Sequence, residues 1–365
     1  MIFDFDNTQM RLVEYLNITE EIFRDAIKQF DGNAEVKITP SFDLGFPHDV
    51  IRIAGGFATG IYVNWNAEIP FVPVDTSVNV CTTSIFELDQ DVSGAITEQY
   101  IQEFRDKFDM KQEYYSFNFH RGNHFIIFAK SKYTNKPYLL LHSSANEFKK
   151  GINGLYPCEG NWYYNYIKTY NAHGRYIRFL VEDKAEQFIN IALSLRDYNR
   201  VRQSFFAHLL LDEMCHIVKE DVYDHYYMPN QQSVAIGCHL VKSGDIAPLL
   251  TAPGVPIYMM RVDDSKEKIE IGNEMYNIVP HGWGKESKVT PKIEIDCDRQ
   301  MFRLNGIEYP IHVESSLRAH PDLQLRNYHE SNKDYFSLIT NDVKLKIVDE
   351  FIQIASYNGK GFKRW

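Results

Sequence analysis

The chain has 365 residues, of which 24% are charged, and a formal net charge of −10 at pH 7. This acidic balance argues against a surface coated for nonspecific nucleic-acid binding, although it is compatible with a local basic groove. No apolar run approaches the roughly 20 residues of a transmembrane helix, so we expect no membrane partner. The five cysteines form no C-x-x-C pair and no secretory leader is visible, which predicts free thiols and a cytoplasmic location.

The pattern of apolar residues predicts an α+β chain. Helical spacing indicates four helical regions: residues 11–31 with a cap at Thr19, 96–111, 183–218 in two parts that divide at about Asp197, and 342–356. Strand formers and turn residues indicate strands and loops over 33–90 and over much of 232–365. No linker divides the sequence, so we expect one interwoven α+β domain over residues 1–365.

Two histidines bracket a predicted β-hairpin. The strand-forming run from His124 to Ala129 is followed by a polar turn at Lys136-Pro137 and by a second apolar run that ends at His142. In an antiparallel hairpin the start of one strand lies beside the end of the other, which predicts Cβ atoms of the two histidines about 5 Å apart. Two imidazoles at that spacing can share a transition-metal ion. The alternative is two unrelated histidines at strand ends.

Further residues of metal-binding types are Asp75, Cys81 and the pair Cys215-His216. With the two hairpin histidines they supply a carboxylate, a thiolate and three imidazoles, a set suited to Mn²⁺ or Zn²⁺. Each also has a structural alternative. Cys81 can be a small core residue, Asp75 a turn cap, and His216 a partner of helix carbonyls.

A glycine-flanked histidine occurs in Pro280-His281-Gly282-Trp283-Gly284-Lys285. Glycines allow the backbone to approach a ligand closely. A neutral histidine nitrogen is a competent nucleophile toward phosphorus. The alternative is a glycine-rich turn with an exposed histidine.

The order of these elements resembles that of the RtcB-type RNA ligase family, from about Lys37 to the end of the chain. The segment Gly122-Asn123-His124-Phe125 matches the family's Gly-Asn-His-Phe without change and is the most specific motif. The other matching segments are Thr39-Pro40-Ser41-Phe42-Asp43, Asp75 with Cys81, Leu140-Leu141-His142-Ser143, Asp197-Tyr198-Asn199-Arg200, Cys215-His216, Ala252-Pro253-Gly254, Pro280 to Lys285, and Gly359-Lys360-Gly361.

The resemblance implies a single large domain with mixed and antiparallel sheets, surrounding helices and a central metal site. It implies an RNA ligase of tRNA processing or RNA repair that joins 3′-phosphate or 2′,3′-cyclic phosphate ends to 5′-hydroxyl ends. The implied partner is RNA with broken or spliced tRNA-like ends. A protein activator and the oligomeric state stay open.

The resemblance also assigns roles to residues. His281 is implied as the nucleophile that forms a bond to the nucleotide of GTP, with ATP as the alternative. The implied nucleotide contacts are Asn123, His281, Gly282 and Lys360. The implied ligands of two Mn²⁺ ions, or of Zn²⁺, are Asp75, Cys81, His124, His142 and His216.

Three departures from the family pattern leave alternatives open. The spacing of Asp75 and Cys81 exceeds the family's D-x-x-C, so Asn79 competes with Asp75 as a ligand. Ile127 stands where the family has an acidic residue that reads guanine, and a basic family segment appears as the uncharged residues 230–233. The alternative functions are a nucleotide-independent metal phosphoesterase and a non-catalytic RNA-end-binding protein on the same scaffold.

Overall fold

The computed structural model describes residues 6–111, 115–120, 123–151, 153–263, 268–312, 315–326 and 345–365. Gly122 of the predicted Gly-Asn-His-Phe motif lies outside these ranges. The α-helices in the described ranges are α1 (Asn7–Lys28), α2 (Val50–Ala54), α3 (Glu98–Lys111) and α4 (Glu182–Leu211). The short 3₁₀ helix η1 (Val74–Thr76) follows strand β3 (Phe71–Pro73).

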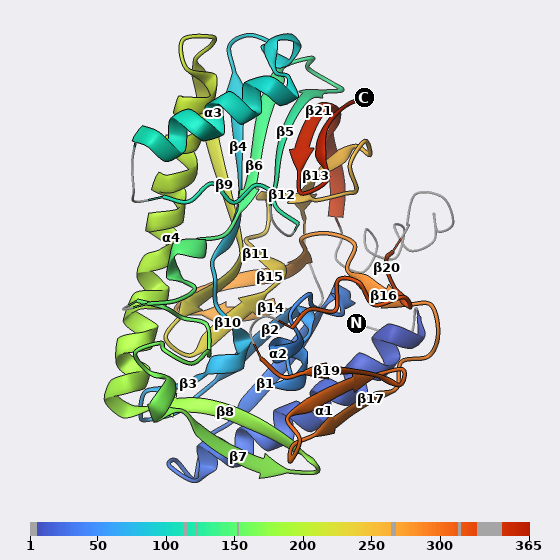
Figure 1. Cartoon of the computed structure of the whole chain (residues 1–365). Helices are drawn as coiled ribbons and strands as arrows, with labels where there is room; N and C mark the ends of the chain where they lie inside the picture. The colour runs from blue at the N-terminus through green and yellow to red at the C-terminus, as the bar shows by residue number, and fades with distance from the viewer. Residues whose placement is uncertain are drawn as a thin grey trace.

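One eleven-stranded antiparallel sheet runs through the molecule (Figure 1). Its strand order is β1 (Val36–Gly45), β2 (Thr59–Trp65), β10 (Ser233–Ile236), β9 (Ile217–Asn230), β4 (Cys81–Leu88), β6 (Pro137–Ser143), β5 (Phe125–Ser131), β21 (Leu345–Asn358), β13 (Ile257–Val262) and β12 (Ile246–Leu249), with β22 (Gly361–Arg364) paired to β21. The combination of helices with antiparallel sheets confirms the α+β class.

Four smaller sheets surround this one. They are β11 (Cys238–Val241) with β15 (Glu274–Pro280) and β14 (Lys268–Ile271); β16 (Lys285–Ser287) with β20 (Leu323–Leu325); β17 (Ile293–Asp296) with β18 (Met301–Leu304) and β19 (Ile307–Pro310); and β3 with β8 (Arg175–Val181) and β7 (Lys168–Ala172).

Helix α1 begins earlier than the sequence pattern predicts. Asp6 caps it, because its carboxylate accepts a hydrogen bond from the Gln9 N–H at 2.8 Å. Thr19 lies inside the helix, and its hydroxyl is within hydrogen-bond distance of the carbonyls of Tyr15 and Gly56. The prediction of a cap at Thr19 is therefore wrong, and the predicted helix over 96–111 is confirmed by α3.

Helix α4 is one continuous helix of 30 residues, so the predicted division at Asp197 is wrong. No glycine or proline interrupts residues 182–211, which explains the continuity. Figure 1 shows α4 along one side of the molecule. Its buried polar side chains hold the start of β4 and the end of β6. Asn199 donates to the Val80 carbonyl at 2.9 Å, Gln203 donates to the Thr82 carbonyl at 2.9 Å, and both donate to the Ser143 carbonyl at 3.2 Å.

The predicted last helix over 342–356 is also wrong. Residues 345–358 form strand β21, and 342–344 lie outside the described ranges. This segment is rich in β-branched residues, and it pairs with β5 on one side and β13 on the other. Tertiary pairing therefore decides its conformation.

All five cysteines are free, and four of them are buried. None of the helices in the described ranges is long and apolar enough to cross a membrane.

Candidate functional site

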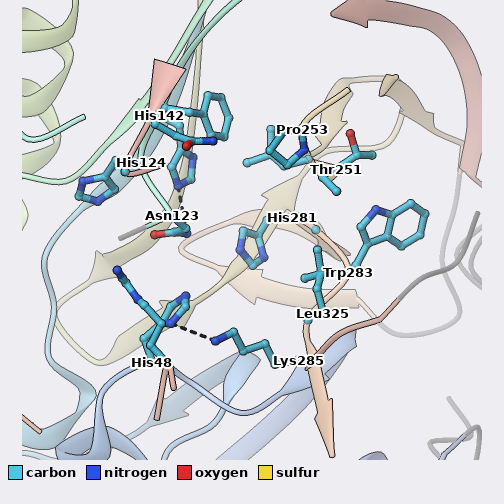
Figure 2. A pocket seen from close by; sticks show the side chains of 18 of the residues that line it. His48, Asn123, His124, His142, Thr251, Pro253, His281, Trp283, Lys285 and Leu325 are labelled. Atoms are coloured by element: carbon cyan, nitrogen blue, oxygen red, sulfur yellow. Dashed lines mark hydrogen bonds between the residues drawn. The ribbon is translucent and has the colours of Figure 1, made fainter. Parts of the chain in front are cut away.

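A cavity of about 520 Å³ opens at the centre of the large sheet, where β5, β6 and β9 approach the loop that follows β15 (Figure 2). Six predicted site residues line it, among them Asn123, His124, His142, His281 and Gly282. Lys360, from the turn between β21 and β22, lines it as well. Among the described lining residues there is no aspartate or glutamate, although the chain as a whole is acidic.

Four aromatic rings form a continuous stack beside this cavity. The ring centroids of Phe125 and His142 are 4.8 Å apart, those of His142 and His225 are 4.9 Å apart, and those of His225 and His281 are 4.9 Å apart. The planes of successive rings differ by 14°, 15° and 20°. His225, which was not among the predicted site residues, therefore connects the hairpin histidine to the glycine-flanked histidine.

Cys81, His142 and His225 form a group that can hold a metal ion. Their ligand atoms all lie within 4.8 Å of one another, and all three residues are buried. The Nδ1 atom of His142 lies 2.9 Å from Thr83 Oγ1, and its Nε2 atom lies 3.3 Å from Cys81 Sγ. His225 donates from Nδ1 to the Tyr223 carbonyl at 3.3 Å, which leaves Nε2 buried without a partner. Hydrogen bonds of this kind orient imidazoles for metal binding.

The protonation states of this group suit a cation. Burial, reinforced by neighbouring histidines, lowers the pKa of His142 and His225 well below the usual value, so both rings are neutral with a lone pair to donate. Burial raises the pKa of the Cys81 thiol to about 12. A coordinated cation deprotonates such a thiol, so this donor set fits a metal ion.

A β-bulge brings His225 into this group. In the pairing of β4 with β9, Cys81 lies opposite Tyr226 and Thr82 lies opposite Asp224, so His225 is the extra residue between them. A bulge redirects the side chain of the extra residue. The local register therefore explains why His225 reaches the interior beside Cys81.

The hairpin of β5 and β6 is confirmed, but its register differs by one residue from the prediction. Phe125, not His124, lies directly opposite His142. His124 donates from Nδ1 to the Asn118 carbonyl at 3.0 Å, and its Nε2 is 3.3 Å from Ser144 Oγ. Its ring centroid is 6.0 Å from that of His142. His124 is thus beside the metal group and stays a predicted ligand.

The structure does not bring the predicted ligand His216 to this group. His216 is exposed and directly precedes β9, where Ile217 pairs with Leu88. Cys81 is at the opposite end of β4, and seven residues of strand span roughly 23 Å. The imidazole that lies beside Cys81 and His142 is that of His225.

The predicted ligand Asp75 is not brought to this group either. Asp75 lies in η1 with its carboxylate fully buried, and Arg178 contacts it with Nε at 3.0 Å and Nη2 at 2.5 Å. This paired carboxylate is not part of the metal group. The alternative ligand Asn79 has a buried Oδ1 without a hydrogen-bond partner, so it stays open.

Asp43, on β1, holds His281. The Asp43 Oδ2 atom is 2.5 Å from His281 Nδ1 and also accepts from the His281 backbone N–H at 3.1 Å. With Nδ1–H donated to the carboxylate, the Nε2 atom of His281 carries the lone pair. Gly284 makes this approach feasible, because a Cβ atom there would lie 2.2 Å from the Asp43 carbonyl oxygen. A neutral imidazole with a lone pair on Nε2 is chemically able to act as a nucleophile.

Cationic groups line the cavity as well. Lys285 Nζ lies 3.2 Å from His48 Nδ1, and Arg318 and Lys360 line the same space. Burial, together with Arg318, lowers the pKa of Lys285 to about 8. No carboxylate pairs with any of these three cations within the described part of the chain. Cations without counter-ions in a cavity favour an anionic ligand.

No model of a known protein family matches this chain, and no curated protein matches it either.

Proposed function

We propose that this chain is a metal-dependent RNA ligase of the RtcB type, which joins an RNA 3′-phosphate or 2′,3′-cyclic phosphate end to a 5′-hydroxyl end through a histidine–nucleotide intermediate. One observation carries the proposal: His281, held by Asp43, stacks on His225 of the metal group and lines a cavity whose described lining residues include no carboxylate. A nucleophile beside a metal group and cations is what phosphoryl transfer requires.

In the first step, His281 Nε2 attacks the α-phosphorus of a nucleoside triphosphate. An N–P bond forms, the P–O bond to the β-phosphate breaks, and pyrophosphate leaves. Asp43 keeps the hydrogen bond from Nδ1 and stabilises the positive charge that develops on the ring. Lys285 and Lys360 offset charge on the phosphates.

In the next steps, an oxygen of the RNA 3′-phosphate attacks the phosphorus bound to His281, and the N–P bond breaks. The RNA end then carries the nucleotide. The 5′-hydroxyl of the second RNA attacks the RNA phosphorus, loses its proton, and displaces the nucleoside monophosphate. A cyclic end must first be opened by water to a 3′-phosphate.

Cys81, His142 and His225 would hold a divalent cation, which supplies a Lewis acid for phosphate oxygens when bound. One thiolate and two imidazoles suit Zn²⁺ better than Mn²⁺, whose sites are rich in carboxylates. The implied second ion would need donors from neighbouring residues such as His124 and Asn79.

The test is a joining assay with two RNA oligonucleotides, one ending in 3′-phosphate and the other beginning with 5′-hydroxyl. We expect a joined product that requires a nucleoside triphosphate and a divalent metal. His281→Ala should abolish joining, and the matched control His216→Ala should retain it. Loss of the 3′-phosphate without joining, independent of nucleotide, would instead support a phosphoesterase and overturn the proposal.

A further inference from the structure

We infer that the nucleotide accepted by this site carries adenine rather than guanine, an inference that rests on the proposed function. The evidence is the chemistry of one side of the cavity. Phe125, Ile127, Leu250 and Pro253 line that side. Ile127 and Leu250 are buried in one hydrophobic cluster, and Phe125 packs against it.

This apolar side is where a base would lie. Figure 2 shows Thr251 and Pro253 on one side of His281 and Lys285 with His48 on the other. Phosphates are attracted to the cationic side, whereas a flat purine can stack on Phe125 and pack on Ile127. A nucleotide whose α-phosphorus faces His281 therefore places its base on the apolar side.

Guanine has a donor-rich edge. Its N1–H and N2–H₂ groups both need acceptors, and a protein carboxylate satisfies both at once. The described lining residues include no carboxylate. Adenine presents an acceptor at N1 in place of a donor, so its edge needs fewer protein acceptors.

Three polar groups on this side each already accept a hydrogen bond. Ser356 Oγ accepts from Trp365 Nε1 at 3.2 Å, and Asn358 Oδ1 accepts from the Lys360 N–H at 2.8 Å. The Ala252 carbonyl accepts from Gln353 Nε2 at 3.1 Å. Donor hydrogens of the Ser356 hydroxyl and the Asn358 amide remain for a ligand. Such groups suit the ring nitrogens of adenine.

Leaving one buried donor of guanine without a partner is enough to weaken binding about tenfold. We therefore expect His281 to be labelled from α-³²P-ATP at least about tenfold faster than from α-³²P-GTP at equal concentration. The α,β-methylene analogues, which cannot transfer the nucleotide, should show the same order of affinity by calorimetry. This second readout does not depend on turnover.

The variant Ile127→Glu adds a carboxylate to the apolar side and should shift the preference toward GTP, while the control Ile127→Leu should keep the preference for ATP. Circular dichroism checks that each variant folds. If Ile127→Glu does not fold, the comparison of ATP with GTP in the wild-type protein still tests the inference. Equal or faster labelling from GTP, UTP or CTP would overturn the adenine inference and leave the proposed function intact. No label from any nucleotide would instead overturn the proposed function and the inference together.

Discussion

The imidazole of His225 stacks on that of His281 with ring centroids 4.9 Å apart and planes inclined by 20°. His225 belongs to the buried metal group, and His281 is held by Asp43 at the wall of the cavity. The stack therefore joins the two halves of the site. A change on one side of this contact should affect the metal, and a change on the other should affect nucleophilic attack.

His225 in β9 and His216, which directly precedes this strand, distinguish a metal ligand from a residue that is only nearby in sequence. His225→Ala should lose bound metal, because it removes one of three donors, whereas His216→Ala should retain the wild-type content. Elemental analysis of purified, buffer-exchanged protein measures both. Equal metal content in the two variants would contradict the assignment of His225.

Asp43 is expected to position His281 rather than to react. Asp43→Asn keeps the size of the side chain but replaces the carboxylate, so the preferred tautomer of His281 is no longer fixed. We expect adduct formation to slow by about 10²–10⁴-fold with little change in nucleotide affinity. Single-turnover labelling and calorimetry measure the two effects. An unchanged rate would show that the contact between Asp43 and His281 has no role in attack.

Asp75 should matter for stability and not for metal binding. Asp75→Asn leaves the Arg178 guanidinium without its charged partner in a mostly buried setting, which we expect to cost about 3 kcal/mol of the free energy of unfolding. Urea denaturation measures the loss, and elemental analysis of the folded variant should show unchanged metal. Loss of metal from a folded Asp75→Asn protein would restore the original ligand assignment.

Some parts of the site could be predicted from the sequence, and others could not. The hairpin and the glycine-flanked His281 could be predicted because both depend on short-range patterns of strand formers and turn residues. The pair Cys215-His216 has a metal-binding composition, but its place at the far end of β4 depends on strand pairing. Asp75 meets Arg178, which is 103 residues away in the sequence. No local pattern shows such a contact.

His225 was missed for a different reason. In the sequence, His225 stands in the run Val222-Tyr223-Asp224-His225-Tyr226-Tyr227. This run is typical of a β-strand and does not indicate a metal group. The direction of its side chain depends on the bulge opposite Cys81, and a bulge cannot be read from alternation alone. Strand β21 shows the same limit, since its apolar spacing fits a helix while its neighbours make it a strand.

Nucleotide binding should depend on pH through Lys285. Burial and Arg318 lower the pKa of this lysine from 10.5 to about 8. The ammonium is charged below that pH and neutral above it, so its attraction for phosphate is present at pH 7 and is lost as the pH rises through about 8. We expect the affinity for α,β-methylene ATP, measured by calorimetry, to fall several-fold between pH 7 and pH 9.

Two lysine variants serve as controls for this pH dependence. Lys285→Arg stays charged over the whole range and should remove the loss of affinity near pH 8. Lys288, which donates to the Pro321 carbonyl at 3.0 Å, does not line the cavity, so Lys288→Arg should leave the dependence unchanged. A loss near pH 8 that persists in Lys285→Arg would assign it to another group.

The most direct test of the account is to locate the covalent adduct. The metal-loaded chain is incubated with each of the four nucleoside triphosphates, and intact-mass measurement is followed by peptide mapping under alkaline conditions, in which a bond between phosphorus and a histidine nitrogen survives. We predict the addition of one nucleoside monophosphate on His281, absent from His281→Ala. An adduct on another residue, or none from any nucleotide in a metal-loaded protein, would contradict the proposed histidine–nucleotide intermediate.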